Sequence, residues 1–276
     1  MLKSLLVAID ETKGSQVAQD LSIALAKRLG ASIKGLAVLD KPWIEAPRAR
    51  PIGTGYYHEH RVASLRKSMS RKLHDLVDSF DDQCETAKVS FELIEKIGAP
   101  VGTIEEEAQG NDLIVVGKDT TFHFAGHNSP SDTVVRLIRD DPRPIILTSS
   151  HPPAAGGGVL IAYDGSLSAS HALHMFVLLG LAKKQNVTLL CVDKNEEEAK
   201  RHAAHASALL SSHGIAATVA CEVTRGAPAS VILDYSSDKS MVVMGAFSNT
   251  HLRDYFFGST TQKLLEKCLA PLFVHH

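Results

Sequence analysis

Short continuous runs of apolar residues alternate along the chain with longer segments in which apolar residues recur every three or four positions. A continuous apolar run is typical of a strand that is buried on both faces of a parallel sheet. The longer period is typical of an amphipathic helix, as where Val17, Leu21, Leu25 and Leu29 are spaced four residues apart. The runs that predict strands are 5–10, 36–41, 113–117, 143–148, 159–164, 189–194, 241–245 and 270–275. This alternation predicts an α/β fold with parallel strands.

The pattern occurs twice along the chain, with one difference in spacing. Asp10 and Asp164 end matching runs 154 residues apart, whereas Gly117 and Gly245 end matching runs only 128 residues apart. The first copy therefore carries an insertion of about 25 residues. Its prolines, glycines and aromatic residues assign residues 41–61 to this insertion and predict a loop or flap.

The repeat divides the chain into two α/β domains, residues 1–150 and 157–276. They are connected by SSHPPAAGGG, residues 149–158, a breaker-rich linker without predicted regular structure. Strand–helix–strand units of this kind are expected to have right-handed crossovers. Each domain is thus expected to build its own parallel sheet.

Composition places the chain among ordinary globular proteins. Apolar residues make up 44%, charged residues 22%, and the net charge is −2, which gives no case for nucleic acid or an anionic membrane as partner. No apolar run has the length of a membrane span, and the first residues do not resemble a secretion signal. The four cysteines contain no C-x-x-C pair. A reduced, cytoplasmic setting is the simplest expectation.

Each domain places an aspartate and a glycine at the ends of two strands, where an open parallel sheet binds its ligands. A carboxylate such as Asp164 accepts hydrogen bonds from a ribose hydroxyl or an adenine amino group. The loop GAFSNTHLRDYFFGSTT, residues 245–261, leads into a helix whose free N–H groups would hold phosphate. Asp164 alone is equally explained as a turn residue in DGS. Aspartate and loop together favour a mononucleotide site.

Taken together, IAYDGSLSASHAL, LLCVDK, GAP and VVMG-x2-S-x9-GST resemble the universal stress protein family, here as a tandem of two domains. The resemblance covers nearly the whole chain except residues 41–61 and the linker. It implies two open parallel five-stranded sheets of order 3-2-1-4-5 with helices on both faces. It also implies that the two domains pack as a pseudo-dimer through their last strands, IILT and LFVH. The sequence leaves open whether two chains then form a homodimer.

The same resemblance implies the ligand, ATP, ADP or AMP with any accompanying Mg²⁺, and the residues that hold it. In the second domain these are Ala162, Asp164, Val192, Met244, Gly245, Ser248, Arg253, Gly258, Ser259 and Thr260. Ser248 replaces the second glycine of the family pattern G-x2-G-x9-G-[ST]. The degenerate first-domain counterparts are Asp10, Gly117, Thr120 and Ser131. There Thr120 and Pro130 replace glycines, and because proline has no N–H, this domain is expected to bind nucleotide weakly or not at all.

No other group of residues in the sequence predicts a second functional site. The histidine pairs expected on solvated surfaces are His58 with His60, His123 with His127, and His202 with His205. Their spacing implies no third ligand, so no metal site is predicted. Trp43, Tyr56 and Tyr57 are expected to fix the insertion to the body rather than to form a lid.

The leading functional hypothesis is a stress-response protein that binds an adenine nucleotide as a sensor or regulatory partner and is not an enzyme. The replacements at Ser248 and Pro130 motivate an alternative, an interaction scaffold with vestigial nucleotide sites. A slow ATPase, or an enzyme such as an ATP pyrophosphatase, is the third class. The sequence lacks a P-loop, a dinucleotide fingerprint and a pair of carboxylates placed for acid–base chemistry.

Overall fold

The computed structural model describes residues 1–46, 55–123, 130–246 and 258–276, with the backbone alone over 55–61. Its strands are β1 (Ser4–Ile9), β2 (Ser32–Asp40), β3 (Phe91–Gly98), β4 (Leu113–Gly117), β5 (Ile145–Thr148), β6 (Val159–Ala162), β7 (Val187–Asp193), β8 (Ala217–Val223), β9 (Met241–Gly245) and β10 (Leu272–His275). Its helices are α1 (Lys13–Leu29), α2 (Lys41–Glu45), α3 (Gly55–Ala87), α4 (Pro100–Ala108), α5 (Asp132–Asp140), α6 (Leu167–Leu178), α7 (Glu196–Ser212), α8 (Pro228–Ser236) and α9 (Ser259–Lys267).

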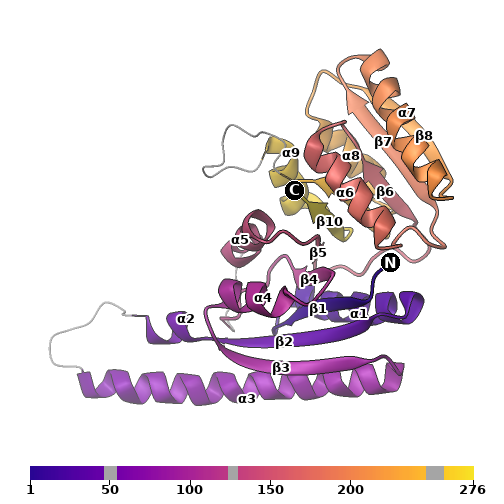
Figure 1. Ribbon diagram of the computed structural model, residues 1–276. Helices are drawn as coiled ribbons and strands as arrows, with labels where there is room; N and C mark the ends of the chain where they lie inside the picture. Colours follow the sequence, from indigo (N-terminus) through magenta and orange to yellow (C-terminus); the bar gives the residue numbers. More distant parts are fainter. Residues whose placement is uncertain (47–54, 124–129, 247–257) are drawn as a thin grey trace.

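The strands form one twisted sheet in the order β3-β2-β1-β4-β5-β10-β9-β6-β7-β8 (Figure 1). Within each half the neighbouring strands are parallel and follow the predicted order 3-2-1-4-5. The halves meet where β5 and β10 pair antiparallel, with Leu147 opposite Leu272 and Ile145 opposite Val274. The predicted strand order and the predicted contact between IILT and LFVH are both confirmed.

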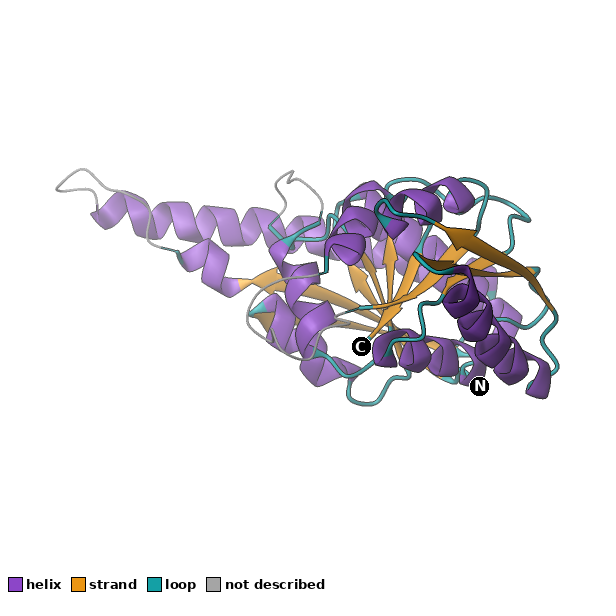
Figure 2. Cartoon of the chain, turned by 90° about the horizontal axis from the view of Figure 1, so that it is seen from above, coloured by secondary structure: helices purple, strands orange, loops and turns teal. Residues whose placement is uncertain are grey.

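Helices cover both faces of this sheet (Figure 2). One face is covered by α1, α3, α6 and α7, whose buried residues include Leu25, Phe80, Leu173 and Leu210. The other face is covered by α4, α5, α8 and α9, whose buried residues include Val101, Leu137, Ile232 and Leu264. Each of these two cores continues across the seam between β5 and β10, so the halves share hydrophobic packing as well as backbone hydrogen bonds.

Both described ends of the insertion differ from its prediction as a loop or flap, and its middle, residues 47–54, lies outside the described residues. Its first residues form α2, where the Asp40 side chain accepts a hydrogen bond from Trp43 N at 2.9 Å and a proline occupies the first turn. Proline is tolerated there because the first helical N–H groups have no partner inside the helix. Its last residues belong to α3, which has 33 residues against 17 in the counterpart α7. Figure 1 shows α3 running beyond the ends of β2 and β3.

None of the helices in the described ranges is both long and apolar enough to cross a membrane.

Candidate functional site

A cavity of about 490 Å³ opens beyond the carboxyl ends of β6, β7 and β9 in the second half. Its lining includes eight residues that the sequence assigned to the nucleotide site: Ala162, Asp164, Val192, Met244, Gly245, Gly258, Ser259 and Thr260. The remaining two, Ser248 and Arg253, lie outside the described residues. The volume lies in the usual range for small-molecule sites, and open parallel sheets bind ligands at this edge.

Charged side chains of both signs border the cavity. The exposed Asp164 carboxylate accepts a hydrogen bond from Ser166 N at 3.0 Å through Oδ1. Asp193, at the end of β7, accepts one from Asn195 N at 2.9 Å. Lys194 is the cation that the described lining supplies. Within the described residues, Asp164 Oδ2 and Asp193 Oδ2 accept no protein hydrogen bond and are available to hydroxyl or amino groups of a ligand.

Close packing against α6 requires a glycine at the end of β9, which was not identified from the sequence. A Cβ on Gly245 would lie 2.3 Å from Ala169 N and 2.4 Å from the carbonyl carbon of Ser168, at the start of α6. Gly117 is in the same position, since its Cβ would lie 2.5 Å from Ser15 N at the start of α1. Both glycines let the first helix of a half pass close to the end of the neighbouring strand. Gly245 therefore shapes the cavity wall whatever the ligand.

The start of α9 differs from the start of its first-half counterpart. Gly258 is the N-cap of α9 and makes no side-chain capping bond, and no atom of the described residues lies within 4 Å of the position of a Cβ. In α5 the Ser131 hydroxyl accepts a hydrogen bond from Val134 N and donates one to Thr120 O. Within the described residues no side chain caps the first N–H groups of α9, which line the cavity, and such an arrangement attracts anions.

The corresponding crevice of the first half is filled by the protein itself. Asp10 is 2% exposed and its Oδ2 accepts hydrogen bonds from Thr121 N at 3.0 Å and Phe122 N at 3.4 Å. Its Oδ1 accepts from the N–H and hydroxyl of Thr12. Burial raises the pKa of Asp10, although these hydrogen bonds oppose the rise. Both oxygens of this aspartate are thus used by the chain, and the Phe122 side chain is 1% exposed.

Thr120 and Ser131, the other first-half candidates, belong to the same closure. Thr120 is fully buried, and its N–H donates to Gly117 O in a turn directly after β4. Ser131 N donates to Lys118 O. The expectation that the first half binds nucleotide weakly rested on Pro130, whereas the structure adds a steric reason, the segment 118–122 folded across Asp10.

Two histidines expected on solvated surfaces are partly buried instead. His123 Nε2 lies 2.9 Å from Asp40 Oδ2, and its ring stacks on Trp43 with 5.0 Å between centroids. The aromatic residue at 43 therefore packs on the body, as the sequence predicted. The rings of His202 and Tyr163 pack in a T-shaped arrangement with 6.4 Å between centroids, and 18% of the His202 side chain is exposed. His58, His60 and His127 lie where no side chain is described.

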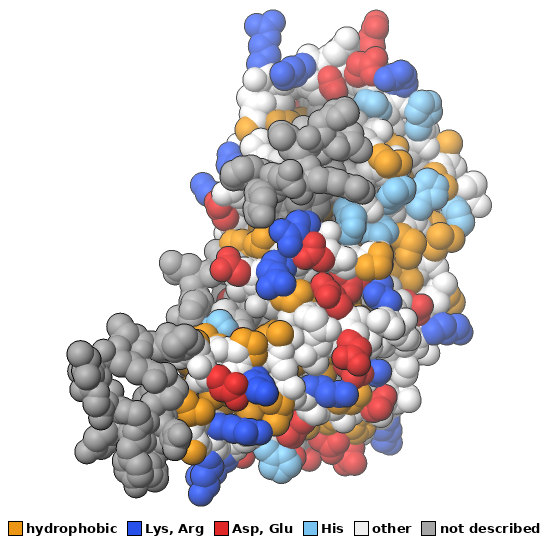
Figure 3. Space-filling model, turned by 60° about the vertical axis from the view of Figure 1, so that its left-hand side comes forward, with side chains coloured by type: hydrophobic (Ala, Val, Ile, Leu, Met, Phe, Trp, Pro, Cys, Tyr) orange, Lys and Arg blue, Asp and Glu red, His pale blue; other side chains and the backbone are white. Residues whose placement is uncertain are grey.

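A third histidine group lies at the end of β10. The ring of His275 lies 6.1 Å from that of His171 and 5.9 Å from that of His276. Figure 3 shows histidine side chains gathered on one face of the molecule. Burial, and then the charges of the two neighbouring histidines, lower the pKa of His275 to about 4. His275 therefore stays neutral over the physiological pH range.

Residues from the β8–α8 connection complete the cavity and were missed from the sequence. Thr224 and Gly226 of this connection line it together with Pro228 and Ile232 of α8. Gly226 and Pro228 belong to the second GAP motif, which was interpreted only as a helix start. That interpretation is confirmed, because α4 begins at Pro100 and α8 at Pro228.

The fold and the cavity define a class of protein: a tandem of two open α/β units of strand order 3-2-1-4-5, with a ligand-sized cavity beyond the second set of strands. The chain belongs to the universal stress protein family, which it matches over residues 1–139 and 158–276.

Similar proteins span the whole chain. Universal stress protein Slr1230 of Synechocystis sp. (strain ATCC 27184 / PCC 6803 / Kazusa) is 25% identical over 291 residues, covering 98% of this chain and 99% of that protein. A universal stress protein from Archaeoglobus fulgidus DSM 4304 superposes with a TM-score of 0.69 at 18% identity, covering 99% of this chain and 97% of that one. A functionally unknown protein from Pseudomonas aeruginosa PAO1 has a TM-score of 0.63 at 17% identity, covering 99% and 92%. These structures share the tandem fold.

Proposed function

We propose that the second half of this stress protein binds an adenine nucleotide, ATP, ADP or AMP, and that the bound state regulates a partner. The observation that carries the proposal is the cavity that both Asp164 and the start of α9 line, where no side chain of the described residues caps the helix. Asp164 would accept hydrogen bonds from the nucleoside, and the N–H groups of residues 259–261 would hold phosphate. Val192, Met244 and Ala162 would supply apolar contact to the base.

The proposal assigns different roles to the two halves. In the first half, Thr121 and Phe122 occupy the position that a ligand would need beside Asp10. In the second half, Asp164 is exposed and accepts its hydrogen bond only from its own turn within the described residues. One nucleotide per chain is therefore the expected stoichiometry, with the first half as a structural partner.

A binding role fits the chemistry of the cavity better than a catalytic one. No histidine or cysteine belongs to its described lining, and its carboxylates accept hydrogen bonds from adjacent turns. A sensor needs affinity and release rather than an activated water or nucleophile. Steady-state ATP turnover faster than a few per minute, about the scale of a slow enzyme, would contradict this part of the proposal.

Isothermal titration calorimetry with ATP, ADP and AMP, with and without Mg²⁺, tests the proposal. Wild type should bind one nucleotide, and Asp164→Ala should weaken binding by about 10- to 100-fold, the usual effect of losing hydrogen bonds to a charged group. Asp238→Ala removes the same charge from an exposed site outside the cavity and is the matched control. If wild type binds no adenine nucleotide, or if Asp164→Ala binds it as well as wild type does, the proposal is wrong, and in the first case the scaffold alternative is favoured.

A further inference from the structure

A second cavity, of about 380 Å³, lies between the two halves and is separate from the proposed nucleotide site. Its walls come from the last two turns of α1, the linker at Pro153–Gly158, the starts of β6 and β9, and the segment Leu181–Asn186 that follows α6. It therefore lies at the amino ends of the second-half strands, whereas the proposed nucleotide site lies at their carboxyl ends. Cavities at junctions between domains are frequent ligand sites.

The charge of this cavity is uncompensated. Arg28, in the last turn of α1, is partly buried, and one terminal guanidinium nitrogen donates to Leu181 O at 3.2 Å. Its Nε is buried and has no hydrogen-bond partner in the part of the chain that the structure describes. No aspartate or glutamate belongs to the described lining. Burial lowers the pKa of Arg28, because the guanidinium has lost water without gaining a carboxylate.

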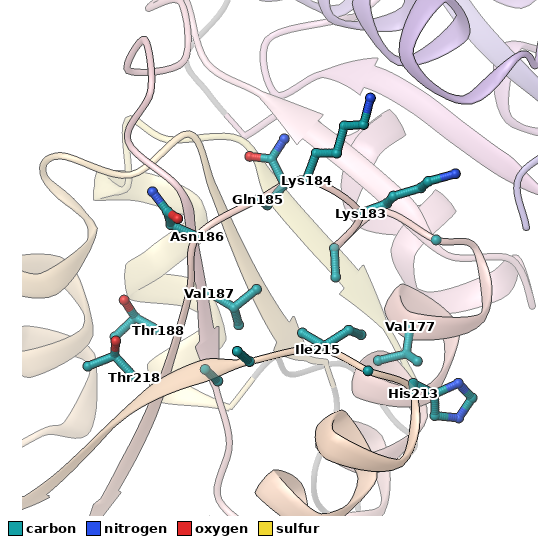
Figure 4. A pocket seen from close by; sticks show the side chains of 15 residues that line it. Val177, Lys183, Lys184, Gln185, Asn186, Val187, Thr188, His213, Ile215 and Thr218 are labelled. Atoms are coloured by element: carbon teal, nitrogen blue, oxygen red, sulfur yellow. The ribbon is translucent and has the colours of Figure 1, made fainter.

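A second cation borders the same space. Lys184 lines the cavity in a left-handed backbone conformation, φ 60°, and Gln185 and Asn186 beside it add amide groups. The segment is held in place by backbone hydrogen bonds, from Val159 N to Asn186 O at 2.7 Å and from Gln185 N to Ala182 O at 3.1 Å. A further cavity, of about 730 Å³, adjoins this one and is also lined by residues 184–186. Figure 4 shows Lys184 extending away from Val187 and Ile215, which line that cavity.

The geometry points to a binding site for a small dianion, a phosphate monoester or a dicarboxylate, held between Arg28 and Lys184. Arginine pairs with such oxyanions through two parallel N–H donors, which the terminal guanidinium nitrogens of Arg28 would supply, because its Nε is buried. Two cations without a neighbouring acid match two negative charges. The ligand would contact α1 of the first half and the 184–186 segment of the second half, so binding would stabilise the junction between the halves.

Calorimetric titration with inorganic phosphate and with malonate, at constant ionic strength set by chloride, tests this site. Wild type should bind at least one of the two dianions. Arg28→Gln and Lys184→Gln should each weaken that binding at least tenfold, whereas Lys27→Gln and Lys183→Gln should change it less than twofold. Lys27 and Lys183 adjoin the two cations in sequence but do not line this cavity, so they control for general charge. Similar affinities for phosphate and malonate would show that the site recognises charge alone, and a preference for one of them would identify the chemical class of the ligand.

Two results would overturn the inference. One is the absence of saturable binding of either dianion to wild type. The other is equal affinity in wild type, Arg28→Gln and Lys184→Gln, which would assign any bound anion to another site such as the start of α9 and leave Arg28 as a tether to Leu181. Arg28→Lys keeps the charge and provides the test if Arg28→Gln does not fold, since it should then retain more affinity than Lys184→Gln. Because these variants leave Asp164 untouched, nucleotide binding should be unchanged in all of them.

Discussion

Replacing Gly245 by alanine should destabilise the protein by about 3 kcal/mol, although the change adds only one methyl group. The added Cβ would lie 2.3 Å from Ala169 N, so the end of β9 and the start of α6 must separate by about 1 Å to reach ordinary contact. Both neighbours are backbone held by regular hydrogen bonding, so the strain cannot be relieved by a side-chain rotation. For a chain of this size, the loss corresponds to a fall in Tm of roughly 6–12 °C.

Gly258→Ala is the matched control for this prediction. No atom of the described residues lies within 4 Å of its Cβ position, so the preference of an N-cap is what changes, and the effect on stability should stay within about 1 kcal/mol. Thermal and urea unfolding, followed by far-ultraviolet circular dichroism without nucleotide, measure both variants. If Gly245→Ala stays within about 1 kcal/mol of wild type, or unfolds no more easily than Gly258→Ala, the close-packing explanation of Gly245 is refuted.

Three further outcomes follow from buried groups. Lys118 donates to Cys268 O across the seam at 2.6 Å, and burial lowers its pKa to about 8. The unfolded chain keeps this proton up to the ordinary pKa of 10.5, so the stability of wild type should rise between pH 8 and 10.5 relative to that of Lys118→Met. Urea titrations should show a gain of up to about 3 kcal/mol. The same pH dependence of stability in both proteins would contradict this. His275 has a folded-state pKa of about 4 against the ordinary 6.5, so protonation favours the unfolded chain. The unfolding free energy therefore keeps its full value above pH 6.5 and decreases as the pH falls towards 4. His275→Gln should remove about 2 kcal/mol of that acid dependence, allowing for partial exposure, and an unchanged acid midpoint would count against the burial argument. Phe122→Ala should lower the unfolding free energy by about 3 kcal/mol, whereas Leu167→Ala, 67% exposed in wild type, should change it by less than about 0.5 kcal/mol in the same assay; equal effects would show that Phe122 does not fill the first-half crevice.

The central strands were predictable because both their faces are buried. In β1, β4 and β9 this burial requires a continuous run of apolar residues, which is visible in the sequence. The edge strands carry no such run: β3 exposes Glu92, Glu95 and Lys96, and β8 is partly exposed throughout. Their existence followed only from the family resemblance. A strand with one neighbour and an open edge takes polar residues that are equally compatible with a loop.

The two described ends of the insertion were misjudged because their loop signals lie at the starts of helices. Pro42 occupies the first turn of α2, and Gly55 stands at the first residue of α3, positions where both residues are tolerated. The α3 helix then continues to Ala87 and packs residues such as Phe80 against the sheet. Tertiary packing therefore decided the conformation over local composition.

The candidate site in the second half could be predicted from the sequence, whereas the closure of the first half could not. Asp164, Gly245 and Gly258 matched a spaced pattern and lie around one cavity. The closure of the first half depends on hydrogen bonds between Asp10 and a segment more than 100 residues later. Thr121 and Phe122 carry no local signal for that contact, so only the folded chain identifies it.

The antiparallel pairing of β5 with β10 unites two related halves within one polypeptide. Two separate subunits in this arrangement would carry identical sequences, and any substitution that closed one crevice would close both. Two halves within one chain need not share a sequence, so Phe122 can cover Asp10 in one half while Asp164 in the other is exposed. The duplication thus permits asymmetry in a symmetric architecture, and dilution cannot separate the two members of the pair.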